Sequence, residues 1–289
     1  MSAVLMDGKV LGKKIRESVK TRSASLREKG IIPCLAVVLA GEDPASMSYV
    51  NSKEKALTEA GMDSRDIRLP YGIEEADLLS IIADLNKDDK IHGILVQLPL
   101  PDHINEEKIT SAIDPGKDVD CFHPVSVGNM VLGRQAFLPC TPHGILVLLG
   151  EYNVPVCGSH VVVAGRSNIV GKPLMNLLIR KEYNATVTLC HTGTKDLARF
   201  LQQADIIIAA AGKPGLITPA MVREGAAVID VGINRVQDSA SKKGYILCGD
   251  VDPAVAEKAA FFSPVPGGVG PMTIAMLLQN VAESAEKRL

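Results

Sequence analysis

Short apolar runs that alternate with helical patterns constrain the fold of this chain more than any other feature. The runs at residues 34–39 and 93–98 are almost entirely aliphatic. Such short runs are typical of strands buried on both faces, as in a parallel sheet covered by helices. Residues 64–69 add a further strand pattern, and helical patterns at residues 44–61 and 74–86 separate the three. This βαβαβ order predicts a parallel α/β sheet in the first third of the chain.

A second alternating series occupies the later part of the chain. Its strands are expected at residues 160–164, 186–190, 205–209 and 226–230, with helices around Leu174–Leu178 and over residues 195–203. Between the two series, residues 114–142 have weak periodicity and indicate a linker or a functional loop, followed by a helix at residues 144–149. A last helix is expected from Pro271 to about Lys287. We therefore predict two α/β domains, one formed by residues 1–140 plus 271–289 and the other by residues 141–270.

The composition of the chain excludes several classes of protein. Hydrophobic residues make up 46% of the 289 residues, and the net charge is −2 without a dominant Lys/Arg block, so a nucleic-acid-binding surface is not expected. No run of 18 apolar residues predicts a membrane span, and the N-terminus lacks the pattern of a signal peptide. The six cysteines form no CxxC motif and are typical of reduced thiols. We expect a soluble cytoplasmic protein.

A glycine-bounded turn follows the strand predicted at residues 160–164. The sequence Gly165-Arg166-Ser167-Asn168-Ile169-Val170-Gly171 lies where a Rossmann domain places its pyrophosphate turn. It departs from GxGxxG, because Ser167 replaces the middle glycine and the outer glycines are six residues apart. The pattern favours dinucleotide binding, and it is also consistent with a βα turn that binds no ligand.

Two residue positions favour NADP over NAD. NAD enzymes place an acidic residue at the end of the second strand, but here that strand ends in Cys190-His191-Thr192. Arg166 in the turn could pair with a 2′-phosphate, or it could be an ordinary surface arginine. The loops at residues 210–215 and 230–234 follow later strands and are suited either to the nicotinamide half or to plain connections.

The first domain carries a separate set of polar residues. Tyr49 and Lys53 are four apart on one predicted helix and share a face. Gln97 lies in an otherwise apolar strand pattern, where a buried amide needs partners. Asp118 and Asp120 lie in an irregular segment, where carboxylates bind ligands or cap turns. A solvated lysine and two capping carboxylates remain the alternative interpretation.

The most distinctive stretch of the sequence is Pro264-Val265-Pro266-Gly267-Gly268-Val269-Gly270-Pro271-Met272-Thr273. Glycine-rich backbone of this kind suits the close approach of a flat ligand. A rigid interdomain hinge is the alternative, and the two interpretations are compatible.

These motifs occur together in one order along the chain. The combination of Tyr49-Val50-Asn51-Ser52-Lys53, residues 93–101, Asp118-Val119-Asp120, residues 165–171 and residues 264–273 resembles the bifunctional methylenetetrahydrofolate dehydrogenase/methenyltetrahydrofolate cyclohydrolase family of the bacterial FolD type. The resemblance covers essentially the whole chain. It implies two α/β domains, the second a Rossmann-like dinucleotide-binding domain, with a cleft between them.

The resemblance also implies two reactions and a role for each site residue. A hydride passes from 5,10-methylenetetrahydrofolate to NADP⁺, and water then opens the methenyl product to 10-formyltetrahydrofolate. Lys53 would be the general acid/base, Gln97 would hold its ammonium, and Tyr49 would position the folate. Asp120 would bind the pterin N–H groups. The substrate set is completed by Val96, Leu98, Pro266, Gly267, Gly268, Val269 and Gly270, and the NADP set is Gly165, Arg166, Ser167, Gly171, Thr192 and Ile233.

The resemblance implies a homodimer formed through the cofactor domain. The six histidines are scattered, so no metal site is expected. Three alternatives remain at this point: a shikimate-dehydrogenase-like NADP oxidoreductase, a monofunctional methylenetetrahydrofolate dehydrogenase, and a non-enzymatic NADP sensor. The presence of both Lys53 and Gln97 argues against loss of the cyclohydrolase.

Overall fold

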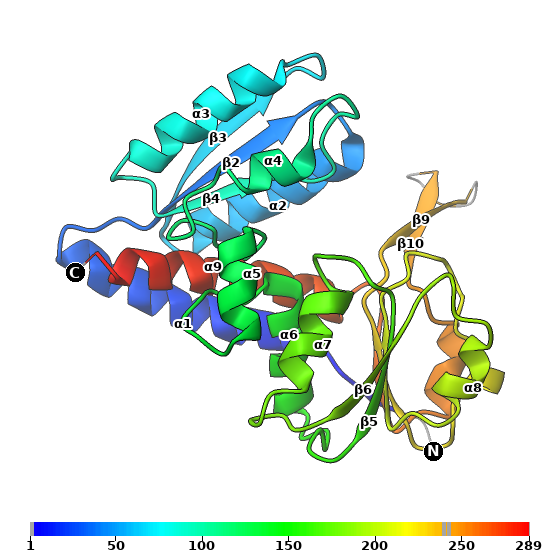
Figure 1. Cartoon of the computed structure of the whole chain (residues 1–289). Coiled ribbons are helices and arrows are strands. Elements are labelled where there is room, and N and C mark those ends of the chain that lie inside the picture. Colours follow the sequence, from blue (N-terminus) through cyan, green and yellow to red (C-terminus); the bar gives the residue numbers. More distant parts are fainter. Residues whose placement is uncertain (1–2, 239–240, 242–243, 289) are drawn as a thin grey trace. The chain divides into compact units, whose positions relative to one another are not determined.

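The computed structural model describes residues 3–238, 241 and 244–288 (Figure 1). The chain divides into two compact units, each with its own parallel sheet. The six-stranded unit comprises residues 1–12 and 141–273, and the three-stranded unit comprises residues 13–140 and 274–289. The predicted fold class, α/β with parallel sheets, is confirmed.

The three-stranded unit has the βαβαβ order expected from the sequence. Its strands are β2 (Cys34–Ala40), β3 (Asp63–Leu69) and β4 (Gly93–Val96). The central strand β2 pairs with both neighbours in parallel. Its helices are α1 (Gly8–Glu28), α2 (Pro44–Glu59), α3 (Glu75–Lys87), α4 (Glu106–Thr110), α5 (Pro124–Val131) and α9 (Val269–Glu286). Helix α1 belongs to this unit from Lys13 onward and α9 from Ile274 onward.

One core of this unit lies between α3 and the sheet. Leu78, Ile82 and Leu85 recur at helical spacing, so they form one buried face of α3. They join Val38 and Ile94 from the strands in one apolar cluster. Burial of this kind contributes about 1.5–3 kcal/mol for each large aliphatic side chain, so the packing holds α3 against the sheet.

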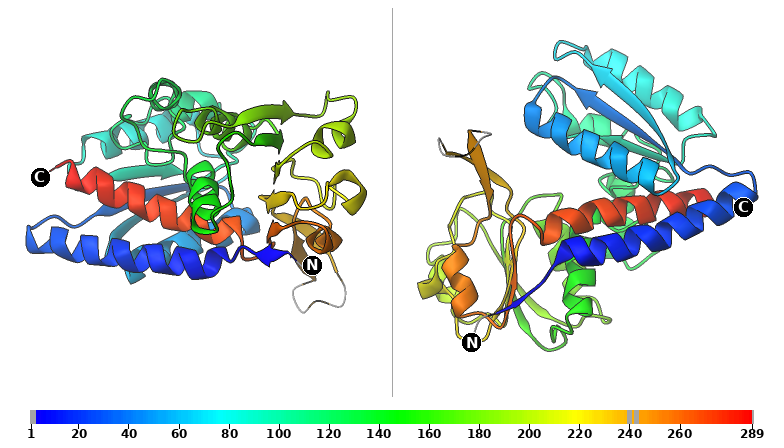
Figure 2. Two further views of the ribbon diagram at one scale, coloured as in Figure 1. Left: turned by 90° about the horizontal axis from the view of Figure 1, so that it is seen from below. Right: turned by 180° about the vertical axis from the view of Figure 1, so that it is seen from behind.

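Helices α1 and α9 lie side by side in the three-stranded unit, as Figures 1 and 2 show. Arg22 of α1 donates two hydrogen bonds to the carboxylate of Glu286 on α9, at 2.9 and 2.8 Å. A bidentate pair of this kind fixes the alignment of two helices better than a single contact does.

The six-stranded unit holds a fully parallel sheet in the order β1-β11-β8-β7-β5-β6. The strands are β1 (Val4–Leu5), β5 (His160–Ala164), β6 (Thr186–Cys190), β7 (Ile206–Ala209), β8 (Ala227–Asp230) and β11 (Phe261–Ser263). Its further elements are α6 (Cys140–Glu151), α7 (Gly171–Leu178), α8 (Leu197–Leu201), the short 3-10 helices η1 (Pro219–Met221) and η2 (Pro253–Glu257), and the antiparallel hairpin β9 (Asn234–Gln237) and β10 (Tyr245–Cys248). Because β5 lies between β6 and β7, the turn that follows β5 is at the topological switch point of the sheet, where α/β folds bind ligands.

Three differences from the sequence-based expectations lie in the first half of the chain. Residues 1–12 belong to the six-stranded unit rather than to the first domain, because β1 pairs in parallel with β11. Strand β4 ends at Val96 and not at Leu98, although the N–H of Gln97 still bonds to the Val38 carbonyl. The region 114–142 is not a plain linker, since it contains α5.

Within the described part of the chain, no helix has the length and apolar character needed to cross a bilayer.

Candidate active site

The backbone of the turn after β5 can follow its observed path only because two of its residues are glycine. Gly165 has φ +135°, and a Cβ there would lie 1.9 Å from the carbonyl oxygen of Ala210. A Cβ on Gly171 would lie 1.9 Å from the carbonyl oxygen of Gly165. Both distances are far inside van der Waals contact, so any larger residue would displace the backbone. The glycines therefore bring β5, β7 and the start of α7 together.

Ser167 explains the departure of this turn from GxGxxG. Its hydroxyl oxygen accepts the backbone N–H groups of Val170 at 3.1 Å and Gly171 at 3.4 Å. These N–H groups belong to the first turn of α7 and would otherwise lack partners in the helix. The Ser167 side chain thus satisfies two backbone N–H groups that a glycine at this position would leave without a side-chain acceptor.

A cavity of about 490 Å³ opens beside this turn. Its lining residues come from the ends of β5, β6 and β7 and the loops that follow them: Ala164, Gly165, Arg166, Ser167, Cys190, His191, Thr192, Thr194, Leu197, Ala210, Ala211, Lys213 and Leu216. Two cations, Arg166 and Lys213, are in this lining, and no carboxylate is among these described residues. The donor set therefore fits a phosphorylated dinucleotide, and it lacks the acid that binds a ribose diol in NAD enzymes.

The structure separates the six cofactor residues expected from the sequence into three groups. Gly165, Arg166, Ser167 and Thr192 line the cavity. Gly171 packs beneath the turn, and Ile233 is 58% exposed and lies outside the lining. Lys213 was not among the predicted cofactor residues, although its place in the loop after a central strand was a usable signal.

The second set of polar residues centres on Lys53 in the three-stranded unit. Helix α2 begins after Asp43, whose carboxylate accepts the N–H of Ser46 at 2.7 Å, with Pro44 at its first position. Lys53 follows Tyr49 by one helical turn, and its Nζ lies 4.5 Å from the centre of the Tyr49 ring. Only 4% of Lys53 is exposed, so α2 turns an ammonium group into the interior of the unit.

Gln97 is the polar partner of that ammonium group. The Nζ of Lys53 donates to Oε1 of Gln97 at 3.0 Å, and Nε2 of Gln97 donates to the carbonyl of Leu98 at 2.7 Å. The second bond fixes which end of the amide faces the lysine. Val96 is buried immediately before Gln97 and holds the strand end in place. The predicted association of Tyr49, Lys53 and Gln97 is thus present in the structure.

The charge on Lys53 is opposed by burial and favoured by nearby acidic groups. Burial lowers the pKa of Lys53, while Asp120 and Cys140 raise it. Because burial is the larger influence, the pKa of Lys53 lies below its ordinary value. A lysine in this state can exchange a proton closer to neutral pH than an exposed lysine can.

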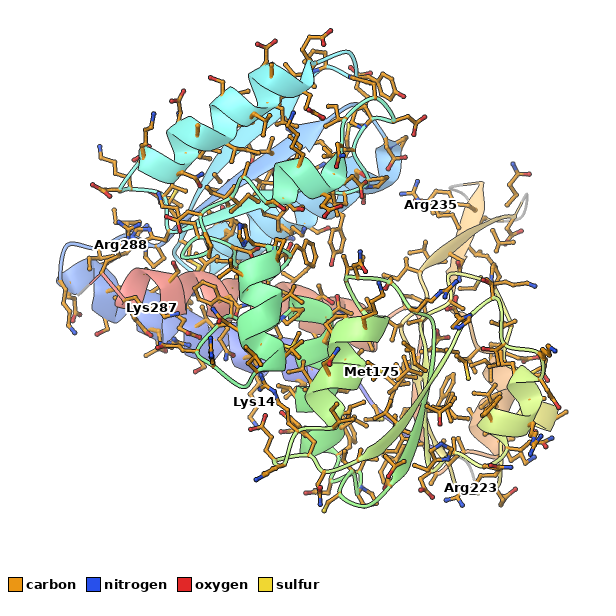
Figure 3. The ribbon with its side chains drawn as sticks, in the orientation of Figure 1. Lys14, Met175, Arg223, Arg235, Lys287 and Arg288 are labelled. Atoms are coloured by element: carbon orange, nitrogen blue, oxygen red, sulfur yellow. The ribbon has the colours of Figure 1, made fainter. Side chains whose placement is uncertain are left out.

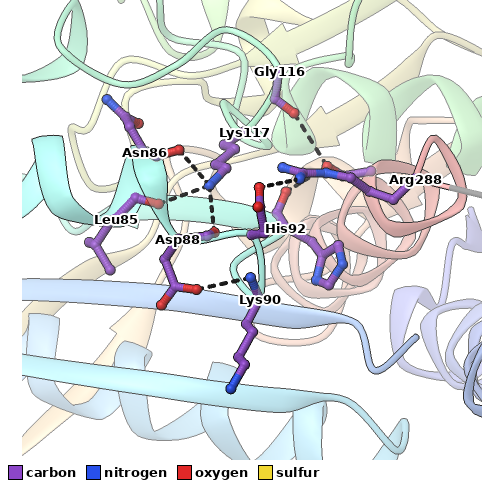
Figure 4. A network of polar contacts seen from close by, with 10 residues as sticks. Leu85, Asn86, Asp88, Lys90, His92, Gly116, Lys117 and Arg288 are labelled. Atoms are coloured by element: carbon purple, nitrogen blue, oxygen red, sulfur yellow. Dashed lines mark hydrogen bonds and ion pairs between the residues drawn. The ribbon is translucent and has the colours of Figure 1, made fainter. Parts of the chain in front are cut away.

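Lys117 anchors the segment that carries Asp120. It is 2% exposed, and its Nζ donates to the carbonyls of Leu85, Asn86 and Asp88 at 2.9, 2.8 and 2.8 Å (Figure 4). These carbonyls lie at the C-terminal end of α3, where a cation is favoured. The bonds tie the chain just before Asp120 to the end of α3.

Asp118 has the capping role that the sequence analysis left open. Its carboxylate accepts the N–H groups of Phe122 at 3.1 Å and His123 at 2.9 Å. Asp118 is buried, and burial raises its pKa although these bonds lower it. Asp120, two residues away, is half-buried and is the carboxylate that acts on Lys53.

Asn280 holds the same segment from the other side. Its side-chain amide on α9 donates to the carbonyls of Val119 at 2.8 Å and Leu138 at 3.0 Å. Asn280 and Lys117 were not predicted from the sequence, because a buried amide and a buried lysine look like surface residues until their distant partners are known.

The glycine-rich stretch lies in the six-stranded unit and leads into α9. Gly267 has φ +117°, and the N–H of Gly268 donates to the carbonyl of Pro264 at 2.7 Å. The backbone of Gly8 packs against this loop, since a Cβ on Gly8 would lie 1.8 Å from the carbonyl oxygen of Gly268. Pro266 is exposed, Val269 is buried and Gly270 is intermediate. The expected substrate residues Pro266 to Gly270 therefore belong to a different unit from Tyr49, Lys53, Gln97 and Asp120.

Among the described residues, no cluster of three or more His, Cys, Asp or Glu side chains could hold a metal ion.

Comparison with known families gives two matches that together span most of the chain. The tetrahydrofolate dehydrogenase/cyclohydrolase catalytic domain matches residues 6–120. The tetrahydrofolate dehydrogenase/cyclohydrolase NAD(P)-binding domain matches residues 139–289. These matches do not favour the shikimate-dehydrogenase-like or monofunctional alternatives.

Individual relatives give the same result. The bifunctional protein FolD of Moorella thermoacetica is 54% identical over 288 residues, which cover 99% of this chain and 100% of the relative. The crystal structure of the bifunctional enzyme FolD from Campylobacter jejuni superposes with a TM-score of 0.95 at 49% identity, covering 100% of both chains. The Trypanosoma brucei FolD complexed with NADP and an inhibitor has a TM-score of 0.95 at 39% identity, covering 100% of this chain and 99% of that one.

Proposed function

The chain belongs to the tetrahydrofolate dehydrogenase/cyclohydrolase family. On this basis we propose which residues act in each of two reactions. In the first, 5,10-methylenetetrahydrofolate is oxidised to the methenyl compound. In the second, this product is hydrolysed to 10-formyltetrahydrofolate. The observation that carries the proposal is the buried Lys53, bonded to Gln97 at 3.0 Å and influenced by Asp120.

NADP is the dinucleotide in this proposal. The nicotinamide, when bound, supplies the acceptor for the hydride that leaves the methylene carbon. Arg166 would pair with the 2′-phosphate that distinguishes NADP from NAD, and Lys213 adds a second positive charge to the same lining. The N-terminal end of α7 would face the pyrophosphate, because that end of a helix favours anions. The relative from Trypanosoma brucei, solved with NADP, supports this choice.

Lys53 would act as general acid and base in the hydrolysis. In its neutral form it accepts a proton from the water that attacks the methenyl carbon. The protonated lysine then donates to N5 of the folate as the carbon–N5 bond breaks, and the second proton of the water leaves to solvent. A lowered pKa brings proton exchange by Lys53 closer to neutral pH than that of an exposed lysine. Gln97 would orient the ammonium group through the bond at 3.0 Å.

Three further groups would bind the folate. Tyr49 would pack against its ring system, and Asp120 would accept pterin N–H groups, since a carboxylate suits two parallel donors. The residues Val96, Leu98 and Pro266 to Gly270 would complete the substrate surface. The glycines of that loop allow the backbone to approach a flat ligand.

A homodimer formed through the six-stranded unit is also part of the proposal. Its hairpin exposes apolar side chains on both strands: Val236 is 37%, Ile246 is 46% and Leu247 is 39% exposed. Arg235 of β9, labelled in Figure 3, lies over the ring of Tyr245 at 4.8 Å. The apolar side chains of the hairpin would then contact a second copy of the chain. Such exposed apolar groups favour association. A cytoplasmic location is proposed as well, supported by the six free cysteines.

The test is an absorbance assay of the purified protein with 5,10-methylenetetrahydrofolate and either NADP⁺ or NAD⁺. We expect reduction of NADP⁺ without lasting accumulation of the methenyl compound. Accumulation of that compound would show that the protein acts as a dehydrogenase but does not hydrolyse the methenyl product effectively. Absence of reduction with both cofactors would refute the proposed function.

A further inference from the structure

A buried carboxylate lies behind the cofactor cavity without lining it. Asp250 is 0% exposed and follows the hairpin strand β10. Its Oδ2 accepts the backbone N–H groups of Ala211 at 2.6 Å and Gly212 at 2.8 Å. Its Oδ1 accepts the N–H of Lys213 at 2.9 Å and the side-chain amide of Asn234 at 2.8 Å. Four N–H donors therefore converge on one carboxylate, and hydrogen bonds to a charged acceptor are the stronger kind.

Three of these donors belong to the loop that follows β7. Ala211 and Lys213 of this loop line the cofactor cavity, whereas Asp250 does not. The carboxylate consequently acts on the backbone of the cavity wall and not on a ligand. Its effect on a bound dinucleotide is through the position of residues 211–213.

The peptide between Ala210 and Ala211 connects Asp250 to the glycine turn. A trans peptide is planar, so its carbonyl and its N–H point in opposite directions. The N–H of Ala211 is held by Asp250, and the carbonyl oxygen of Ala210 lies 1.9 Å from the place of a Cβ on Gly165. If this peptide rotated, its carbonyl would leave its present place beside Gly165. The bond to Asp250 therefore helps to hold the Ala210 carbonyl in its place beside that turn.

A second carboxylate holds the backbone of Asp250 itself. Oδ1 of Asp230, at the end of β8, accepts the N–H of Asp250 at 2.9 Å and that of Gly232 at 3.0 Å. Oδ2 of Asp230 accepts the N–H of Val251 at 3.1 Å. Asp230, at the end of a sheet strand, thus holds the backbone of Asp250, and the side chain of Asp250 holds the cavity wall.

We propose that Asp250 is a positioning residue for the dinucleotide, acting through the backbone N–H groups of residues 211–213 to hold the cavity wall in register with the turn at Gly165. The inference rests on the proposed use of NADP. It assigns a role in cofactor affinity to a side chain that neither lines the cavity nor contacts the ligand.

The primary test is the Asp250→Asn variant. An amide keeps the size of the side chain but places an NH₂ group against two of the four N–H donors, so two hydrogen bonds become repulsive contacts. Titration with NADPH, followed by the cofactor's fluorescence, should give a Kd about tenfold higher than that of the wild type. The matched control is Asp252→Asn: its Oδ1 accepts the N–H of Ala254 at 2.9 Å in η2, away from the loop. The control should keep the wild-type Kd.

Amide hydrogen exchange in the cofactor-free protein separates positioning from general loss of structure. The amides of residues 211–213 should exchange faster in Asp250→Asn, while those of β5 and β7 keep their protection. Weaker NADPH binding with this local change supports the inference. An unchanged Kd in a folded Asp250→Asn protein overturns it, as does a higher Kd without faster exchange of residues 211–213. If the wild type itself does not bind NADPH, the proposed cofactor is wrong, and the inference fails with it.

Asn234→Ala is the second variant if Asp250→Asn does not fold. It removes one of the four donors and leaves the three backbone bonds in place. We expect NADPH binding to weaken by about threefold, together with faster exchange of the Lys213 amide, which shares Oδ1. Wild-type values for both measurements would overturn the inference.

Discussion

The cofactor cavity of the six-stranded unit and the lysine site of the three-stranded unit differ in what forms them. The cavity depends on backbone: Gly165 and Gly171 allow close approach, and α7 begins directly after the turn, where the helix dipole favours a phosphate. The lysine site depends on side chains, with the buried Lys53 held by Gln97 and influenced by Asp120.

This difference follows from the chemistry proposed for each region. Binding a dinucleotide requires room and hydrogen-bond donors, which the main chain supplies at fixed positions. Moving a proton requires an ionisable side chain whose pKa has been changed by its surroundings, and burial supplies that change. Substitutions that alter volume should therefore affect the first region most, and substitutions that alter charge should affect the second.

The largest effect is expected for Lys53→Met. Loss of the proton carrier should reduce hydrolysis of the methenyl compound by at least about a hundredfold, while the Kd for NADPH stays unchanged because Lys53 does not line the cavity. The measurement is the decay of methenyl absorbance with the cofactor absent. The matched control is Lys55→Met, since Lys55 lies on the same helix with its side chain 79% exposed. Hydrolysis at the wild-type rate in Lys53→Met would show that the lysine is not the acid/base.

The corresponding change in the cavity is Gly165→Ala. The new methyl group would lie 1.9 Å from the Ala210 carbonyl oxygen at a φ of +135°, so strain and overpacking together should cost about 2–5 kcal/mol. We expect NADPH binding to weaken by about a hundredfold and the free energy of unfolding to fall. Gly158→Ala is the control, because Gly158 has φ +76° with no atom within 4 Å of its Cβ position. Equal losses in both variants would mean that φ strain alone matters, and that close approach does not.

Arg166→Ala tests whether a side chain also contributes to the cavity. Loss of a charge-assisted pair with the 2′-phosphate should weaken NADP⁺ binding about tenfold and leave NAD⁺ binding nearly unchanged. Calorimetric titration with both cofactors measures the difference. Arg199→Ala on α8, an exposed arginine outside the cavity lining, should change neither. An equal loss for both cofactors would refute the 2′-phosphate role.

The charge dependence of the lysine site can be tested with Asp120→Asn. Asp120 raises the pKa of Lys53 against the effect of burial, so removing its charge should lower the pKa of Lys53 further. Since the neutral lysine is the proposed base, the acidic limb of the kcat profile for hydrolysis should move to lower pH. The profile of Asp102→Asn, an exposed carboxylate in the same unit, should match the wild type. A limb that stays in place or moves to higher pH would contradict the electrostatic link.

The same contrast explains what the sequence could predict. Apolar runs such as residues 34–39 and 160–164 identify buried strands directly, and the glycine turn at residues 165–171 identifies the cavity. The hairpin β9–β10 was missed because its strands are short and half-exposed. Such strands carry little of the periodicity on which the prediction depends.

The supporting residues could not be predicted because their partners are distant in the chain. Asn280 bonds to the carbonyl of Val119, 161 positions away, and Lys117 bonds to the end of α3. Asp250 bonds to residues 211–213, 37 to 39 positions away. A single sequence contains no signal that brings these groups together, whereas Tyr49 and Lys53 are paired by the helical repeat alone.

The smallest effect is expected for Ser167→Gly, which tests the backbone character of the cavity most closely. The change removes the hydroxyl that accepts the N–H groups of Val170 and Gly171. Glycine at such a position costs only a few tenths of a kcal/mol relative to a capping side chain, about 0.3 kcal/mol. It also leaves two N–H groups free to bind a phosphate, so the Kd for NADPH should change by no more than about threefold. Ser159→Gly, whose hydroxyl bonds to the carbonyl of Pro155 outside the cavity lining, is the control. A loss greater than about tenfold in Ser167→Gly alone would mean that the hydroxyl itself binds the cofactor, and the contrast between a backbone-built cavity and a side-chain-built lysine site would then not hold.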